Sequence, residues 1–222
     1  MNKLTFALIS ATMLSTLAKA DFYVGAQLGN AFNEGKKVQT DNTYSTLLAS
    51  GAGPNIVGGL IMGYDYMSDS DLYLALEGNL AYHNLNKITQ SQTPLQNQGN
   101  TITTKTKFNN HLLYGISAQF GYKLDQYMIP FVSIGGMGGQ YKITNNSVET
   151  TNGSTTSQTL SSKKSIFTIS PGLGFKYNTD QWLASVKYEY FIIPELKIIE
   201  SGTPVTHKLR EHIVTASIAY RF

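Results

Sequence analysis

The sequence contains no cysteine, which excludes disulfide and metal-thiolate chemistry and agrees with an exported protein. Charged residues make up only 14% of the 222 residues, whereas 41% are hydrophobic. No stretch reaches the ~18 consecutive apolar residues that a membrane-spanning helix requires. The chain therefore has enough apolar side chains for a large buried surface, and that surface is not supplied by spanning helices.

The first 20 residues, MNKLTFALISATMLSTLAKA, form a separate segment. Lys3 provides a short basic region, residues 4–17 are a mostly apolar run, and the small-x-small sequence AKA ends at Ala20. This pattern is typical of a secretory signal peptide and is too short for a membrane anchor. We therefore predict a signal peptide at residues 1–20 and one mature domain at residues 21–222.

The charge balance of the predicted mature chain excludes one class of partner. The full chain has a formal charge of +3. Removal of residues 1–20 takes away Lys3 and Lys19 and no acidic residue, which leaves a formal charge of +1. A chain this close to neutral lacks the basic surface that nucleic-acid-binding proteins use. We therefore expect no nucleic-acid partner.

Eight segments of the mature chain alternate apolar and other residues with a period of two, which is typical of β-strands. The segments are residues 21–29, 55–67, 71–83, 111–124, 127–141, 165–177, 181–191 and 212–222. In the third segment, for example, Leu72, Leu74 and Leu76 alternate with Tyr73 and Glu77. Glycines blur the fifth segment, where we assign Val132 and Ile134 to the apolar face and Phe131, Ser133 and Met137 to the other.

The connections between these segments alternate in length. Three of them are only SDS, DQ and NTD, which are tight-turn sequences. The other four span roughly 17 to 25 residues and are rich in Thr, Asn, Ser and Gln. Short turns at one rim and long loops at the other, with an even number of antiparallel strands, are typical of transmembrane barrels. We predict an all-β fold, an eight-stranded antiparallel transmembrane β-barrel with short periplasmic turns and four long extracellular loops.

The apolar sets have aromatic residues near the short turns, as expected of the girdles at a membrane surface. These residues are Tyr64, Tyr66, Tyr122, Tyr177, Trp182, Tyr220 and Phe222. We therefore expect the apolar faces to contact lipid and the polar faces to line the interior. Since no lipid-exposed backbone amide can stay unpaired, the last strand must bond to the first, and the alternation accordingly runs to Phe222.

Several short motifs resemble small outer-membrane barrels of the OmpA transmembrane domain, OmpX and Opa class: AKA, GYDY, QFGYKL, SIGGMG, SPGLGFKY, VKYEY and the final AYRF. The resemblance implies an outer-membrane location with lipid and lipopolysaccharide as partners. It also implies that the outer-membrane assembly machinery reads the terminal residues Val214, Ala216, Ile218, Tyr220 and Phe222. No peptidoglycan-binding domain follows, so cell-wall anchoring is not expected.

Charged residues on the inward faces suggest an internal network, because an eight-stranded barrel is just wide enough to be filled by side chains. Glu77, Lys187 and Glu189 lie near mid-depth, and Asp65, Lys123, Lys176 and Arg221 lie towards the periplasmic end. We hypothesise that Glu77 and Lys187, from opposite walls, pair across the lumen and block it. The alternative is that these charges sit in interior water.

Catalytic and metal-binding arrangements have little support. His83 and His111 fall near the external ends of neighbouring strands, but two histidines without a third ligand make a weak metal site. Outer-membrane lipid-modifying enzymes use a histidine and a serine at the outer rim. His212 and Thr215 are the most similar residues in this sequence, but no nucleophile is adjacent in the required way. GGMGG precedes no helix and is therefore not a phosphate loop. We predict no catalytic residue, no metal and no cofactor.

The specific function is therefore expected to be carried by the long external connections between the strands. We expect the Thr-rich stretches within residues 86–107 and 142–164 to extend the strands as protruding hairpins, with Asn152 and Gly153 at a tip, or else to form mobile cover. If these connections mediate adhesion, deletion of residues 86–104 and 144–162 should abolish attachment. The apolar residues Ile192, Ile193, Leu196, Ile198 and Ile199 are expected to pack over the mouth, touch lipopolysaccharide or bind a partner. The favoured function is a structural surface protein that binds a host surface ligand or mediates adhesion. The alternatives are a narrow channel for ions or small solutes and a lipid-modifying enzyme.

Overall fold

The computed structural model describes residues 20–39, 55–94, 101–151, 154–194, 196–200 and 203–222. These residues contain no helix that is long and apolar enough to cross a bilayer. They form nine strands: β1 Asp21–Gln39, β2 Asn55–Met67, β3 Leu72–Pro94, β4 Thr101–Tyr122, β5 Met128–Thr151, β6 Ser154–Asn178, β7 Trp182–Ile192, β8 Leu196–Glu200 and β9 Thr203–Arg221. The predicted signal peptide lies almost entirely outside the described residues, so its cleavage stays a prediction.

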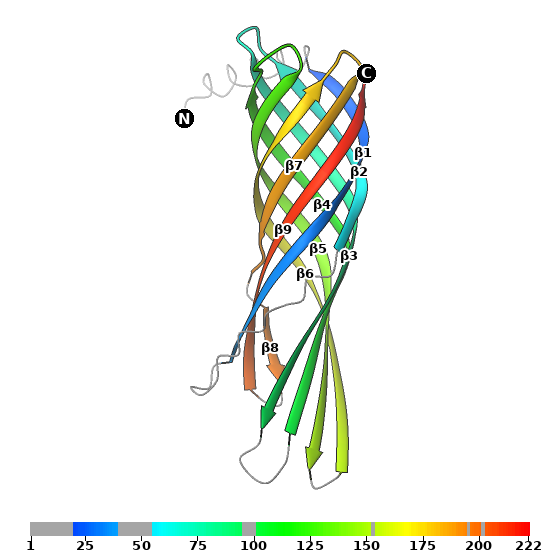
Figure 1. Ribbon diagram of the computed structural model, residues 1–222, viewed down its shortest axis with the longest axis vertical. Coiled ribbons are helices and arrows are strands. Elements are labelled where there is room, and N and C mark those ends of the chain that lie inside the picture. Colours follow the sequence, from blue (N-terminus) through cyan, green and yellow to red (C-terminus); the bar gives the residue numbers. More distant parts are fainter. Residues whose placement is uncertain (1–19, 40–54, 95–100, 152–153, 195, 201–202) are drawn as a thin grey trace, which may run out of the picture.

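The strands close into a barrel (Figure 1). The order is β1 to β7 followed by β9, and every neighbouring pair is antiparallel. The closing pair joins the first strand to the last, from Tyr23 opposite Arg221 to Gln39 opposite Val205. The predicted eight-stranded antiparallel barrel is confirmed, and its eight segments correspond to β1–β7 and β9.

The additional strand β8 continues the line of β7. Both strands pair with β9: β7 ends with Ile192 opposite Arg210, and β8 begins with Leu196 opposite His207. The interruption coincides with Pro194, which has no N–H to donate to a ladder. The stretch around Ile198 is therefore strand, paired opposite Val205, and Ile193 is buried inside the barrel. The side chains of Leu196, Ile198 and Ile199 lie outside the described residues.

The barrel is apolar on the outside, as predicted from the alternation. Leu60, Leu76, Ile116 and Val186 are about half exposed, whereas their neighbours in sequence, such as Ile61 and Glu77, are buried. The face assignment made for the glycine-blurred β5 segment also holds, since Val132 and Ile134 are exposed and Phe131, Ser133 and Met137 are buried.

Two of the β5 glycines have a packing reason on the outer face. A Cβ atom added at Gly138 would lie 2.7 Å from the Tyr114 ring, and one added at Gly136 would lie 2.5 Å from the Phe167 ring. Glycine at these positions lets the aromatic rings of β4 and β6 lie against the backbone of β5, a known way to fill the gap left by glycine in barrels.

The three tight turns gather at one rim, which is at the top of Figure 1 together with the C-terminus. In the first, the Leu72 N–H donates to Ser68 Oγ at 3.0 Å, and Asp71 has a φ of 63°. In the second, the N–H groups of Tyr127 and Met128 both donate to Asp125 Oδ1 at 2.7 Å. In the third, the Trp182 N–H donates to Thr179 Oγ1 at 3.0 Å. Each turn is thus fixed by a Ser, Asp or Thr side chain that substitutes for a backbone partner.

At the opposite rim the strands extend far beyond the barrel (Figure 1). β3 and β4 stay paired out to Pro94 opposite Thr101, and β5 and β6 out to Thr151 opposite Ser154. For the described residues 86–94, 101–107, 142–151 and 154–164, this register confirms the expectation that the two connections prolong the strands as hairpins. Residues 152 and 153, the predicted tip, lie outside the described residues.

Candidate functional site

An ion network crosses the middle of the barrel. Lys187 of β7 lies 3.0 Å from Glu77 Oε1 and 3.3 Å from Glu189 Oε2, measured from its Nζ atom. Glu77 belongs to β3, which stands four places from β7 in the ring of eight strands, on the opposite wall. All three side chains are nearly inaccessible to solvent. The Lys187–Glu77 pair therefore spans the full width of the lumen, and Glu189 pairs with Lys187 from the same strand.

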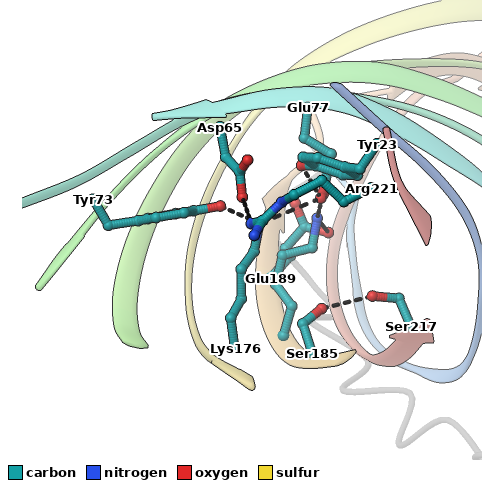
Figure 2. A network of polar contacts seen from close by, with 10 residues as sticks. Tyr23, Asp65, Tyr73, Glu77, Lys176, Ser185, Glu189, Ser217 and Arg221 are labelled. Atoms are coloured by element: carbon teal, nitrogen blue, oxygen red, sulfur yellow. Dashed lines mark hydrogen bonds and ion pairs between the residues drawn. The ribbon is translucent and has the colours of Figure 1, made fainter. Parts of the chain in front are cut away.

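Lys176 of β6 adds a second cation, two residues nearer the short turn than the position opposite Lys187. Its ammonium donates to the Tyr73 hydroxyl at 2.5 Å and lies 4.0 Å from Glu77 Oε2. It also lies 5.0 Å from the centroids of both the Tyr23 and Tyr73 rings, a distance at which cation–π attraction contributes. Tyr23 in turn donates from its hydroxyl to Glu77 Oε2 at 2.9 Å. Figure 2 shows these side chains converging inside the barrel.

Arg221 closes the network at the periplasmic end. Its Nη2 donates to Asp65 Oδ2 at 2.5 Å, and its Nε lies 3.8 Å from Asp21 Oδ2. These residues come from β9, β2 and β1, so the contacts cross the seam at which the first and last strands meet. A separate hydrogen bond between the hydroxyls of Ser185 and Ser217, at 2.6 Å, joins β7 to β9 (Figure 2).

Six of the seven charged residues singled out in the sequence thus lie in two ion-paired groups, with Glu77, Lys176, Lys187 and Glu189 in one and Asp65 and Arg221 in the other. Lys123 differs, because it follows the end of β4 in the turn, where its N–H donates to the Asp71 carbonyl at 2.9 Å. No ion pair involves Lys123 within the described part of the chain. Sequence reasoning missed Tyr23 and Tyr73, although both occupy inward positions of the alternation. The alternation does place Tyr73 on the inward face beside Glu77, but the predicted network contained charged residues only and therefore left both tyrosines out.

The external half of the interior is apolar rather than polar. Ten buried side chains from all eight wall strands and the segment after β7 pack together there: Ala31, Val57, Ala81, Leu113, Met137, Tyr141, Ile166, Phe191, Ile193 and Ile213. The expectation of a polar interior is therefore wrong for this half. The physical reason is that a narrow barrel leaves room for side chains to fill the lumen like a protein core, and packed apolar groups do so without needing partners.

One pair of titratable side chains lies at the level of this apolar cluster. His83 Nε2 is 2.9 Å from Glu211 Oε1, and both side chains are fully buried. The side chain of His111, proposed as the neighbour of His83, lies outside the described residues. Among the residues that the structure describes, no three His, Asp or Glu side chains come together as a metal site would require.

His212 and Thr215 lie on opposite faces of the barrel wall, so the idea that they act together at the rim is wrong. Thr215 is buried inside. Nδ1 of His212 lies 2.7 Å from the Tyr188 hydroxyl, and its ring is 5.0 Å from the Tyr190 ring. Positions that are three residues apart in a strand necessarily point to opposite sides.

Comparisons with known proteins agree with this architecture. The family model of the outer membrane protein β-barrel domain matches residues 4–222. The outer membrane protein OprG from Pseudomonas aeruginosa has a similar fold, with a TM-score of 0.50 and 14% identity over 91% of this chain and 96% of OprG.

Two further solved structures have lower scores. Ail, the attachment invasion locus protein of Yersinia pestis, has a TM-score of 0.44 and 13% identity over 90% of this chain and 98% of its own. Neisserial surface protein A has a TM-score of 0.42 and 15% identity over 91% of this chain and 99% of its own. Comparison with curated protein sequences gives no match. The match over nearly the entire chain places the protein in the outer membrane protein β-barrel family, and it is accordingly an outer-membrane protein.

Proposed function

We propose that the protein is a surface protein with a sealed barrel, whose external hairpins carry its specific activity. The observation that carries the first half is the filling of the lumen at two levels. The Glu77–Lys187–Glu189 group spans the middle, and the ten-residue apolar cluster fills the external half. Ions would have to displace buried, mutually paired charges and then cross a packed apolar layer, and both steps are costly.

Recordings from planar lipid bilayers test the seal. The protein purified from outer membranes is expected to give no stable ohmic conductance. A reproducible ohmic step would instead support the alternative function, a narrow channel for ions or small solutes. Lys187→Ala and Phe191→Ala, measured separately and only on protein that has kept its strand content, serve as variants with a weakened seal, since each removes one side chain from one level.

The second half of the proposal, adhesion or binding of a host surface ligand, is supported by the strand edges of the external extension. β2 pairs with β3 only as far as His83, and β6 pairs with β7 only from Gly172 onwards. Among the described residues, the outer parts of β3 and β6 therefore have a ladder partner on one side. An edge strand of this kind is a template to which a partner adds a strand through main-chain hydrogen bonds.

Shortened hairpins test this role. Replacing residues 89–106 and 145–160 each by Asn-Gly keeps the register pairs Ile88–Lys107 and Thr144–Ser161 and closes both ladders with a two-residue turn. The variant is expected to fold into the same barrel, while cells carrying it lose attachment to host cells. Unchanged attachment would contradict the adhesion role, and the variant with only the first replacement shows which hairpin is responsible.

A further inference from the structure

The two ends of the barrel carry charge of opposite sign, which the formal charge of the whole chain conceals. The short turns contain four acidic residues and one basic residue: Asp69, Asp71, Asp125, Asp180 and Lys123. On the described strands, the positions external to the apolar belt include eleven basic residues: Lys36, Lys37, Lys87, Lys105, Lys107, Lys142, Lys163, Lys164, Lys197, Lys208 and Arg210. The acidic residues of the described strands there are Glu34, Glu149, Glu200 and Glu211, the last of which is buried inside the barrel. The external rim is therefore strongly cationic.

The basic residues are most concentrated on β5 and β6. Lys142 and Lys163 are directly opposite each other in the ladder, and both side chains are exposed, as is that of Lys164. Neither Lys142 nor Lys163 has an ion pair among the residues that the structure describes. On β4, Lys107 occupies the register position opposite Thr144, two residues further along β5 from Lys142. Arg210 on the other side of the barrel differs, because Glu34 occupies the position opposite it.

Two lysines in direct cross-strand opposition repel each other, and such pairs are destabilising in sheets. Neighbouring positions with Asn, Ser or Thr do not relieve the repulsion, since they carry no negative charge. An anion bound between the two ammonium groups would remove the repulsion and add two favourable interactions. The arrangement is therefore complementary to a compact, multiply charged anion such as a phosphate group.

The position of the pair relative to the membrane indicates where the anion comes from. On β6, the exposed apolar residues run in alternation from Tyr177 and Phe175 out to Phe167. Ten residues of strand tilted by about 40° cover the ~25 Å height of an apolar belt. Lys163 continues the same alternation four residues further, about 13 Å along the strand at ~3.3 Å per residue. The pair thus lies on the lipid-facing side of the sheet, just outside the hydrocarbon layer.

We propose that Lys142 and Lys163 bind the phosphate groups of anionic glycolipids in the outer leaflet, whose acyl chains cover the belt below. This inference rests on one part of the proposed function, namely that this rim faces the outside of the cell. It does not depend on whether the lumen is sealed. Lysine suits the task because its long apolar stem follows the strand surface while its ammonium group stays in the polar layer.

The test measures the thermal unfolding midpoint of the purified protein in neutral detergent micelles, with added diphosphorylated lipid A or the same lipid after phosphatase treatment. Diphosphorylated lipid A is expected to raise the midpoint, and the dephosphorylated lipid is expected to leave it nearly unchanged. The Lys142→Gln/Lys163→Gln variant should lose most of the rise. Lys142→Arg/Lys163→Arg should keep it, and Lys123→Gln at the opposite rim is the matched control that should behave as the original protein.

Inorganic phosphate and a heparin fragment are the soluble competitors. An equal rise with the double Gln variant, or with dephosphorylated lipid, would overturn the proposal. So would a rise of the same size with inorganic phosphate or the heparin fragment, because the site would then recognise soluble anions rather than a lipid headgroup. A conductance measured in bilayers would refute the sealed lumen without affecting this outcome, so the two failures are distinguishable.

Discussion

Lys187 and Glu77, 110 residues apart in sequence, meet at the centre of the barrel with Nζ and Oε1 3.0 Å apart. Replacement of Lys187 by Met would leave Glu77 and Glu189 facing each other in a water-poor interior. We expect a loss of about 3–5 kcal/mol in the free energy of unfolding. Urea titrations followed by the fluorescence of Trp182, the one tryptophan of the chain, measure this loss.

The double variant Lys187→Met/Glu77→Gln provides the control for that experiment. It removes both charges of the central pair and leaves Glu189 and Lys176 in balance, so it should be more stable than Lys187→Met alone. If the stability losses of the single variants Lys187→Met and Glu77→Gln add up to that of the double variant, the contact contributes nothing beyond what each residue does separately.

Phe191 is expected to matter far more than another phenylalanine of the same wall. Phe191 is 2% exposed within the apolar cluster of the lumen, whereas Phe175 is 53% exposed on the lipid face. Phe191→Ala should cost about 3–5 kcal/mol because it leaves an internal cavity. Phe175→Ala should cost clearly less, since lipid chains refill the space. Equal losses in the same urea titration would argue against a packed lumen.

The turn at Asp125 is expected to make stability depend on acid pH. Two backbone N–H groups, of Tyr127 and Met128, donate to its carboxylate and lower the pKa of Asp125 below its ordinary value. A lowered folded-state pKa means that the stabilisation is complete above the ordinary value of about 3.9 and is lost as the pH falls through the folded value.

The Asp125→Asn variant should flatten this acid dependence and keep most of the stability at neutral pH, because an amide oxygen accepts the same bonds. Asp125→Ala should lose both the acid dependence and the stabilisation at neutral pH. Thermal unfolding between about pH 2 and 7 compares the three proteins. An acid dependence of Asp125→Asn that is as steep as in the original protein would assign the effect to other groups.

Removal of the Lys142–Lys163 repulsion should stabilise the protein when no anionic lipid is present. In neutral detergent, Lys142→Gln/Lys163→Gln is expected to gain about 0.2–1 kcal/mol, the range measured for cross-strand pairs. The gain should shrink as salt is raised, because exposed charges are screened within ~8–10 Å at physiological ionic strength. A loss of stability under these conditions would show that the two ammonium groups do not repel each other.

Phe222 is expected to matter more for assembly than for stability. Its N–H donates to the Phe22 carbonyl at 2.9 Å, but its side chain is 74% exposed. Deletion should cost about 1 kcal/mol in the purified protein, the net worth of one hydrogen bond. The amount of folded protein in the outer membrane should fall much more steeply. Phe222→Tyr, which retains a terminal ring, should restore it; a fall matched to the stability loss alone would contradict an assembly signal.

The sequence by itself determined the barrel, the number of wall strands and the face that each residue occupies. These properties follow from local rules, since alternate residues of a strand point to opposite sides and a bilayer forbids unpaired backbone at its core. The positions of Leu76 outside and Glu77 inside, for example, required no knowledge of any other strand. The protruding hairpins were also readable, because strand-forming threonines continue past the apolar residues.

Only the tertiary structure decided which inward residues meet. Inward position alone does not distinguish Lys176, which lies against Tyr23 and Tyr73, from a solvated lysine, because the stagger of the strands sets the depth of each residue. The same holds for Phe191 and Ile213, whose inward apolar side chains contradict a simple inside-out pattern until ten of them are seen to pack together. Contacts across a closed barrel join residues that are distant in sequence, and their pairing depends on closure of β1 against β9.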